Sequence, residues 1–84
     1  MRMRNKNIKI FGALSEILEN EITLDLPNEI NRQIILSNLT EKFPLQASEI
    51  EKCNVAVNQT YVFDEVVKND ENTEIAIIPP VSGG

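Results

Sequence analysis

The chain has 84 residues, which limits it to one domain. It contains no His, no Trp and a single Cys, so nucleophile–His pairs, His-ligated metal sites and cysteine clusters are excluded, and we expect no metal. Eight Lys and Arg against thirteen Asp and Glu give a net charge of −5, and such a surface repels the phosphate backbone of nucleic acids.

The first part of the chain predicts a strand, a short helix and a second strand. Residues 7–11 alternate between polar and apolar side chains, which indicates a strand, and Gly12 breaks it. Apolar residues at i, i+3 and i+4 across 14–18 predict a short amphipathic helix. Strict alternation over 21–26 predicts the next strand, which Pro27 ends.

The main helix is predicted over residues 31–42, with Asn28 or Asn31 as its N-cap. Pro44 ends it, because the residue before a proline avoids the α region. The expected buried stripe is Ile35, Leu36, Leu39 and Phe43. Residues 45–52 are interpreted as a polar connection.

The second half of the chain predicts three strands. Residues 54–58 form the first, and a turn at Asn58-Gln59 leads into a short strand at 61–63. A turn-rich loop at 68–72 precedes the last strand, 74–78. In that strand Ile75 and Ile77 face one way, and Ala76 and Ile78 face the other.

This order of elements predicts an α+β roll of the β-grasp type. One mixed sheet, with the main helix packed on one face, would bury both apolar stripes in two layers. The first and last strands would then lie side by side and parallel in the centre. We expect a β-grasp domain over residues 1–78 and a flexible C-terminal tail over 79–84.

The compartment follows from the cysteine content and the apolar runs. One cysteine cannot form an internal disulfide, which is typical of a cytoplasmic protein. The apolar runs are only a few residues long, so we expect no membrane span. Residues 1–6 are basic and no apolar segment of signal length follows them, so they are interpreted as a frayed lead-in.

The last six residues read Pro79-Pro80-Val81-Ser82-Gly83-Gly84. The prolines cannot continue a central strand, and six extended residues reach at most about 20 Å. Two glycines make a tip thin enough for a narrow channel, and they let the backbone of another protein approach closely. The terminal carboxylate is ionised at pH 7 and is a poor electrophile, so its use requires activation, for instance as an acyl-adenylate. The simpler interpretation is a frayed terminus.

Two segments carry a resemblance to a known family. Ala56-Val57-Asn58-Gln59 and the run from Glu74 to the Pro-Pro-Val-Ser-Gly-Gly ending resemble the small, sulfur-carrier subunits of molybdopterin synthases. The resemblance implies a ubiquitin-like β-grasp fold. It also implies that the chain has no side-chain active site of its own and acts as the sulfur-donating subunit of a sulfurtransferase complex, a heterotetramer built around a dimer of the large catalytic subunit.

The resemblance further implies the chemistry of the tail. A ubiquitin-activating-type enzyme that uses ATP adenylates Gly84, and a sulfur donor protein converts the adenylate to a thiocarboxylate. The tail then inserts into the large subunit and delivers sulfur to cyclic pyranopterin monophosphate in molybdenum cofactor biosynthesis. The chain itself binds no cofactor. Gly84 is thus the catalytic residue, and the partner-binding residues are Gly83, Ser82, Val81, Pro80 and Ile78.

The chain departs from the family pattern at two places. The usual Asp-Gly-Asp turn before the last strand reads Glu71-Asn72-Thr73, where Asn72 tolerates the left-handed conformation that such a turn requires. Ile77 and Ile78 stand where family members often have aromatic residues. Both departures concern packing and partner fit rather than the tail chemistry.

Other functions stay open at this point. A sulfur carrier of the thiamine pathway has the same fold and Gly-Gly ending. A ubiquitin-like modifier would be joined through Gly84 to lysines of other proteins, and a plain interaction module would have an inert tail. Cys53 is interpreted as a half-buried structural residue rather than a sulfur acceptor. The remaining candidates are interpreted as solvated surface (Glu49, Glu51, Asp70 and Glu71) or as core or edge packing (Tyr61 and Phe63).

Overall fold

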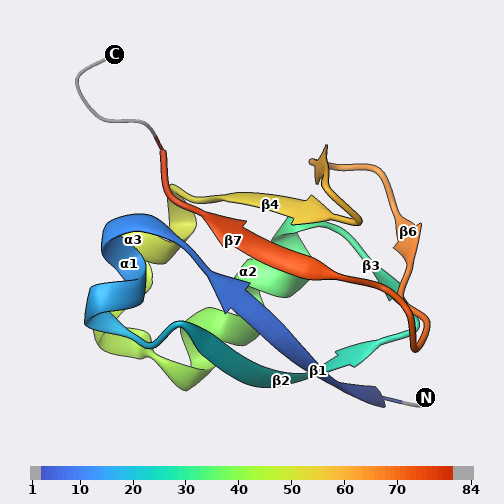
Figure 1. Cartoon of the computed structure of the whole chain (residues 1–84), viewed down its shortest axis with the longest axis horizontal. Helices are drawn as coiled ribbons and strands as arrows, with labels where there is room; N and C mark the ends of the chain where they lie inside the picture. Colours follow the sequence, from blue (N-terminus) through green and yellow to red (C-terminus); the bar gives the residue numbers. More distant parts are fainter. Residues whose placement is uncertain (1–2, 81–84) are drawn as a thin grey trace.

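The computed structural model describes residues 3–80 of the chain. Five strands form one sheet in the order β2-β1-β7-β4-β5, and two short strands, β3 and β6, form a second (Figure 1). The elements are β1 (Met3–Ile10), α1 (Gly12–Ile17), β2 (Glu21–Pro27), β3 (Glu29–Ile30), α2 (Arg32–Lys42), the 3₁₀ turn η1 (Pro44–Gln46), α3 (Ala47–Glu51), β4 (Asn54–Val57), β5 (Thr60–Val62), β6 (Val67–Lys68) and β7 (Ile75–Ile78).

The first and last strands lie next to each other in the middle of the sheet, as predicted. β1 and β7 are parallel, with Ile8 opposite Ile75 and Ile10 opposite Ile77. β2 flanks β1 and β4 flanks β7, both in antiparallel pairing. Helix α2 covers one face of this mixed sheet, so the structure confirms the α+β β-grasp fold (Figure 1).

The core lies between the sheet and α2. β2 turns every second side chain, Ile22, Leu24 and Leu26, into the core, and α2 contributes the predicted Ile35, Leu36 and Leu39. The predicted stripe of the short helix is confirmed only in part. Leu14 is buried, but Ile17 remains 54% exposed because α1 packs at the end of the sheet rather than across it (Figure 1).

Helix α2 begins and ends where the sequence predicts. The side chain of Asn31 accepts a hydrogen bond from the backbone N–H of Ile34 at 2.9 Å, so Asn31 and not Asn28 is the N-cap. Phe43, the residue before Pro44, has an extended φ of −130° and closes the helix.

Three short segments differ from the prediction. Residues 3–6, interpreted as a frayed lead-in, belong to β1 and pair with the far end of β2, where Lys6 lies opposite Leu24. Residues 45–52, interpreted as a connection, contain most of η1 and all of α3, which buries Ile50 completely. β3 and β6 have two residues each, which is too short for any periodicity to reveal.

The β4–β5 turn contacts the residue that precedes strand β7. At the predicted β4–β5 turn, Asn58 and Gln59 both have positive φ, 52° and 69°, as a two-residue type I′ hairpin requires. The N–H of Asn58 donates to the carbonyl oxygen of Glu74 at 2.8 Å, and the side chain of Asn58 accepts from the N–H of Glu74 at 2.9 Å. The hairpin is therefore tied to Glu74, the residue just before the last strand.

The turn before β7 is held by a side chain and not by a left-handed residue. Among the described residues other than glycine, only Asn58 and Gln59 have positive φ, so the left-handed conformation expected for Asn72 is wrong. Instead the carboxylate of Asp70 accepts hydrogen bonds from the N–H of Asn72 at 2.9 Å and from the hydroxyl of Thr73 at 3.1 Å. These two bonds hold the pKa of Asp70 below its usual range.

The shared core can be tested with two cavity-forming variants. Leu24→Ala and Leu39→Ala should each lower the free energy of unfolding by about 2–5 kcal/mol, a large part of the roughly 4–13 kcal/mol expected for a chain of this length. The same change at Leu45, which is 91% exposed, serves as the control and should cost less than about 0.5 kcal/mol. Urea unfolding midpoints that moved no more for the two core variants than for Leu45→Ala would exclude this core.

The Asp70 turn predicts a pH dependence of known sign. Because folding lowers the pKa of Asp70, its contribution to stability is present above its unfolded pKa and is lost as the pH falls through the folded value. Asp70→Asn keeps an acceptor oxygen but removes the titration. The wild-type protein should therefore be more stable than this variant, and the difference in unfolding free energy should be larger at pH 7 than at pH 2. Urea unfolding at the two pH values measures this difference. A difference that does not change with pH would contradict the assignment.

Candidate functional site

The chain leaves the sheet at the end of β7. The backbone N–H of Phe11 donates to the carbonyl oxygen of Ile77 at 3.1 Å, which holds the end of β1 against the end of β7. Pro79 and Pro80 follow Ile78 and have no N–H to offer a neighbouring strand. The structure thus confirms that the prolines direct the chain out of the sheet, at the end where α1 and α3 lie (Figure 1).

Some of the predicted site residues lie within the described part of the chain and others lie outside it. Ile78 is half-buried, Pro79 is half-buried and Pro80 is exposed. The predicted sites at Val81, Ser82, Gly83 and Gly84 lie outside the described residues, so their roles stay predictions. What the structure adds is the surface from which this segment starts.

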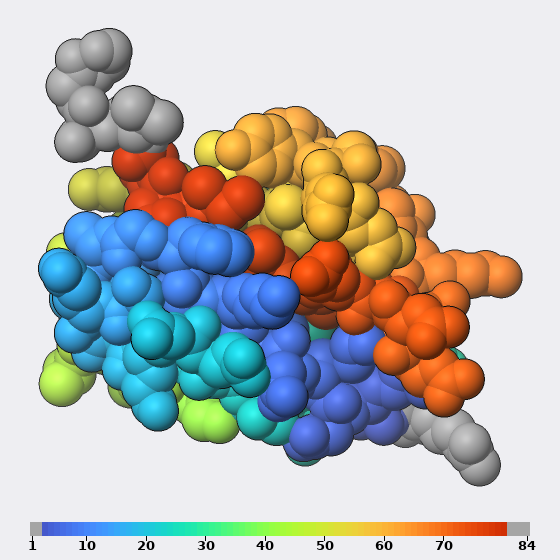
Figure 2. Space-filling view, in the orientation of Figure 1, coloured from blue at the N-terminus to red at the C-terminus, as the bar shows by residue number. Residues whose placement is uncertain are grey.

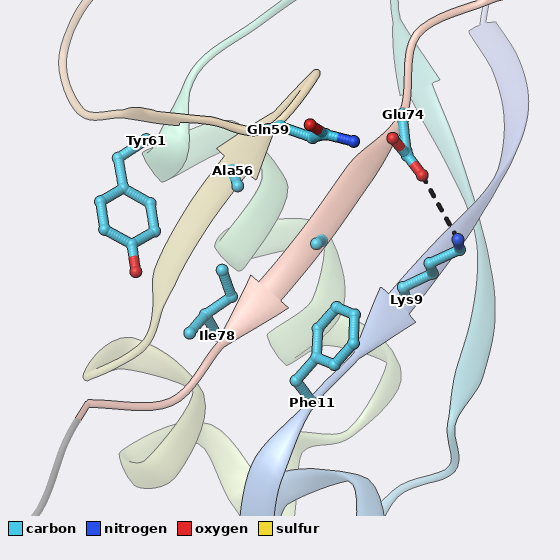
Figure 3. A pocket seen from close by; sticks show the side chains of 8 residues that line it. Lys9, Phe11, Ala56, Gln59, Tyr61, Glu74 and Ile78 are labelled. Carbon is cyan, nitrogen blue, oxygen red and sulfur yellow. Dashed lines mark hydrogen bonds and ion pairs between the residues drawn. The ribbon is translucent and has the colours of Figure 1, made fainter.

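That surface is the face of the sheet opposite α2. This face carries a shallow hollow with a volume of about 390 Å³. Figure 3 shows the side chains that line it, with β7 running between them. Its lining residues come from β1, β4, β5 and β7 and the ends of these strands: Lys9, Phe11, Ala56, Gln59, Tyr61, Glu74, Ala76 and Ile78. In the space-filling view β7 runs as an orange-to-red band between β1 and β4 (Figure 2).

Apolar and aromatic side chains gather at one end of this hollow and charges at the other. Phe11 and Tyr61 are 50% and 49% exposed, and Ile78 lies between them (Figure 3). At the opposite end the ammonium group of Lys9 and the carboxylate of Glu74 form an exposed ion pair at 3.3 Å. We call Phe11, Tyr61, Ala76 and Ile78 the sheet-face patch; an apolar centre with charged residues at its edge is the usual composition of a protein–protein contact.

Two of these residues were missed or misread in the sequence. Phe11 was assigned only as the end of a strand, although the alternation that buries Ile8 and Ile10 already turns residue 11 to the opposite face. Tyr61 lies on the edge strand β5 and Phe63 directly follows it, so the edge position is confirmed. The alternative prediction, that Tyr61 and Phe63 pack in the core, is wrong, because about half of each residue is exposed.

Cys53 is a structural residue. Its side chain is 1% exposed and its thiol lies 3.4 Å from the carbonyl oxygen of Glu49. Burial raises the pKa of Cys53, and the nearby charge of Arg32 lowers it by less. A buried thiol with a raised pKa is a weak nucleophile, so Cys53 is unsuited to accept sulfur.

The other candidate clusters lie at the surface. Glu49, Glu51 and Glu71 are exposed, as interpreted from the sequence, and Asp70 holds its turn. Over residues 3–80 no three His, Cys, Asp or Glu side chains are grouped as a metal site would require. None of the helices described for this chain is long and apolar enough to cross a membrane.

The sequence matches known proteins over nearly its whole length. The ThiS family matches residues 8–84. The molybdopterin synthase sulfur carrier subunit of Dictyostelium discoideum is 39% identical over 80 residues, which are 92% of this chain and 93% of the relative.

Two solved structures share the fold. SAMP1 from Haloferax volcanii has a TM-score of 0.73 at 23% identity, and 96% of this chain aligns with all of that chain. A chain in the complex of subunits 1 and 2 of molybdopterin-converting factor from Helicobacter pylori 26695 has a TM-score of 0.66 at 22% identity, again over 96% of this chain and all of that one. The structural matches show the fold alone, whereas the sequence matches also show the family. The chain belongs to the ThiS family, and its resemblance to the sulfur-carrier subunits of molybdopterin synthases is confirmed.

Proposed function

We propose that the protein is the sulfur-carrier subunit of a molybdopterin synthase. The observation that carries this proposal is the 39% identity to the Dictyostelium subunit of that name, which extends over more than nine-tenths of both chains. The site agrees with it, because an exposed apolar hollow on the sheet lies beside the start of the tail.

The proposed chemistry takes place at the carboxyl group of Gly84. A carboxylate oxygen attacks the α-phosphorus of ATP in the activating enzyme, and pyrophosphate leaves. A sulfur donor protein then supplies sulfur at the oxidation level of sulfide, which attacks the carbonyl carbon, displaces AMP and leaves a thiocarboxylate. That sulfur is delivered to cyclic pyranopterin monophosphate, and two deliveries build the dithiolene of the molybdenum cofactor. This chain contributes the carrier group, and ATP is bound by the activating enzyme.

The large catalytic subunit is the proposed occupant of the sheet-face patch. Ile78 belongs to the patch and stands two residues before Pro80, so a partner that receives the tail meets this face first. Residues 81–84 extended reach at most about 14 Å beyond Pro80, which requires the partner's channel to open close to the patch. The partner contact therefore continues from the tail onto the sheet. We expect the assembly to be a heterotetramer with the large-subunit dimer at its centre.

The partner surface can be tested with Ile78→Lys. Burying an unpaired ammonium group should weaken association with the large subunit by about 3 kcal/mol, more than a hundredfold in Kd. Because the side chain is already partly exposed in the free protein, the isolated fold should survive. Val66→Lys is the matched control, since Val66 is 56% exposed and lies outside the patch. Titration calorimetry with equal affinities for the two variants would place the contact elsewhere, and unfolding of Ile78→Lys would make it a core residue.

The tail mechanism can be tested by changing its length. Removing Gly84, or adding one residue after it, should abolish sulfur delivery, because the reactive carbonyl moves by about 3.5 Å and a misplacement of about 1 Å can already cost on the order of a hundredfold in rate. Gly83→Val should act likewise by blocking close backbone approach. The unfolding midpoint should not change. The measurement is single-turnover conversion of cyclic pyranopterin monophosphate by the reconstituted complex.

Intact mass spectrometry provides the control for this test. After incubation with ATP, the activating enzyme and a sulfur source, the wild-type chain should gain the mass of one sulfur in place of one oxygen. Truncated and extended chains that deliver sulfur at the wild-type rate would exclude the carrier mechanism. Isopeptide conjugates to other proteins in cell extract, without the thiocarboxylate, would favour a protein modifier instead.

A further inference from the structure

Pro79 packs directly on the backbone of Gly12. Gly12 starts helix α1 and has a φ of +66°. A Cβ atom built on Gly12 would lie 3.0 Å from Cγ and 3.3 Å from Cδ of Pro79. Distances this short are tighter than ordinary van der Waals contact, so a side chain at residue 12 would push the proline ring away by a few tenths of an ångström.

Both prolines border a hollow beside α1. Pro79 and Pro80 line a hollow of about 230 Å³ together with Ala13 and Ile17 of α1 and Lys52 after α3. The hydrogen bond from the N–H of Phe11 to the oxygen of Ile77 fixes the two backbones next to Gly12. Residues of α1 and the end of α3 therefore lie close to the first two residues beyond the sheet, and Pro79 itself is placed by Gly12 and by β7.

We infer that Gly12 is a positioning residue for the tail: it leaves room for the ring of Pro79 and so sets where, and in which direction, the chain leaves the sheet. This inference rests on the proposed function. Proline fixes its own φ near −65° and restricts the residue before it, so a shift of the Pro79 ring is passed on to Pro80 and beyond.

The reach of the tail makes this placement matter for sulfur transfer. Four residues follow Pro80 and span at most about 14 Å. When the sheet-face patch is docked and Gly84 lies at the acceptor, both ends of this short segment are held. A displaced start then displaces the reacting carbonyl, and about 1 Å at a reacting atom can cost on the order of a hundredfold in rate.

Backbone strain and contact with the ring can be separated by choosing the substitution. Asn tolerates a positive φ better than other residues with a side chain, so Gly12→Asn accepts the turn but brings a Cβ against Pro79. Pro79→Ala removes Cγ and Cδ, the two nearest ring atoms, and leaves Cβ at an ordinary 3.8 Å. The double variant therefore restores the space that the single Asn variant lacks.

The experiment is a double-mutant cycle on the single-turnover rate of sulfur transfer, with the thiocarboxylate form of each full chain and saturating large subunit. Gly12→Asn should lower the rate at least about tenfold, while its Kd for the large subunit stays within about threefold of wild type. Gly12→Asn combined with Pro79→Ala should be no slower than Pro79→Ala alone. If the Asn variant does not fold, the contact is still tested in the wild-type protein by the nuclear Overhauser measurement described below.

Three results would overturn the inference: a wild-type rate in Gly12→Asn, rate losses that simply add in the double variant, or a Kd that weakens in proportion to the rate, which would make Gly12 part of the docking surface. An independent readout is the nuclear Overhauser effect between the Hα atoms of Gly12 and the ring protons of Pro79, whose absence in the wild-type protein would also overturn it. If that effect is present but the wild-type thiocarboxylate transfers no sulfur, the proposed carrier function is wrong, whereas the contact of Pro79 with Gly12 is confirmed.

Discussion

The parallel pairing of β1 with β7 is the interaction on which the rest of the structure depends. It joins the first and last strands of the described chain in the middle of the sheet, with Ile8, Ile10, Ile75 and Ile77 buried beneath. A central strand has neighbours on both sides, so its end is held more firmly than that of an edge strand. The tail therefore starts from a fixed point, although the side chains of its last residues, Ser82, Gly83 and Gly84, are small or absent.

The same pairing also explains why one end of the molecule carries the proposed function. β1 ends at Ile10 and β7 ends at Ile78, so the parallel register places Phe11 beside Ile78 and Gly12 beside Pro79. Phe11 and Ile78 line the hollow on the open sheet face, whereas Gly12 begins α1 and Pro79 lies against it. The proposed docking face and the start of the tail thus arise from residues at and just beyond the ends of two paired strands.

Much of this arrangement could be predicted from the sequence, because the responsible signals are local. Period-two alternation in β2, the Asn31 cap and the Pro44 stop of α2 each reflect a few neighbouring residues. What could not be predicted depends on residues far apart in the chain. The strand character of residues 3–6 comes from pairing with β2, and the turn at Asp70 is set by the reach of one carboxylate. The contact of Gly12 with Pro79 has a sequence separation of 67 residues and no periodicity that could reveal it.

The sheet order also has a consequence for the synthesis of the protein. β7 is the last of the described strands to be made, yet it belongs between β1 and β4, so the sheet cannot close until residue 78 has been added. Contacts between such distant segments form late, and an unfinished chain leaves β1 and β4 with open edges and exposed apolar side chains. Chains that stop before β7 lack the central strand and cannot form this sheet. The topology thus provides quality control, because a molecule able to fold has already been extended through Ile78.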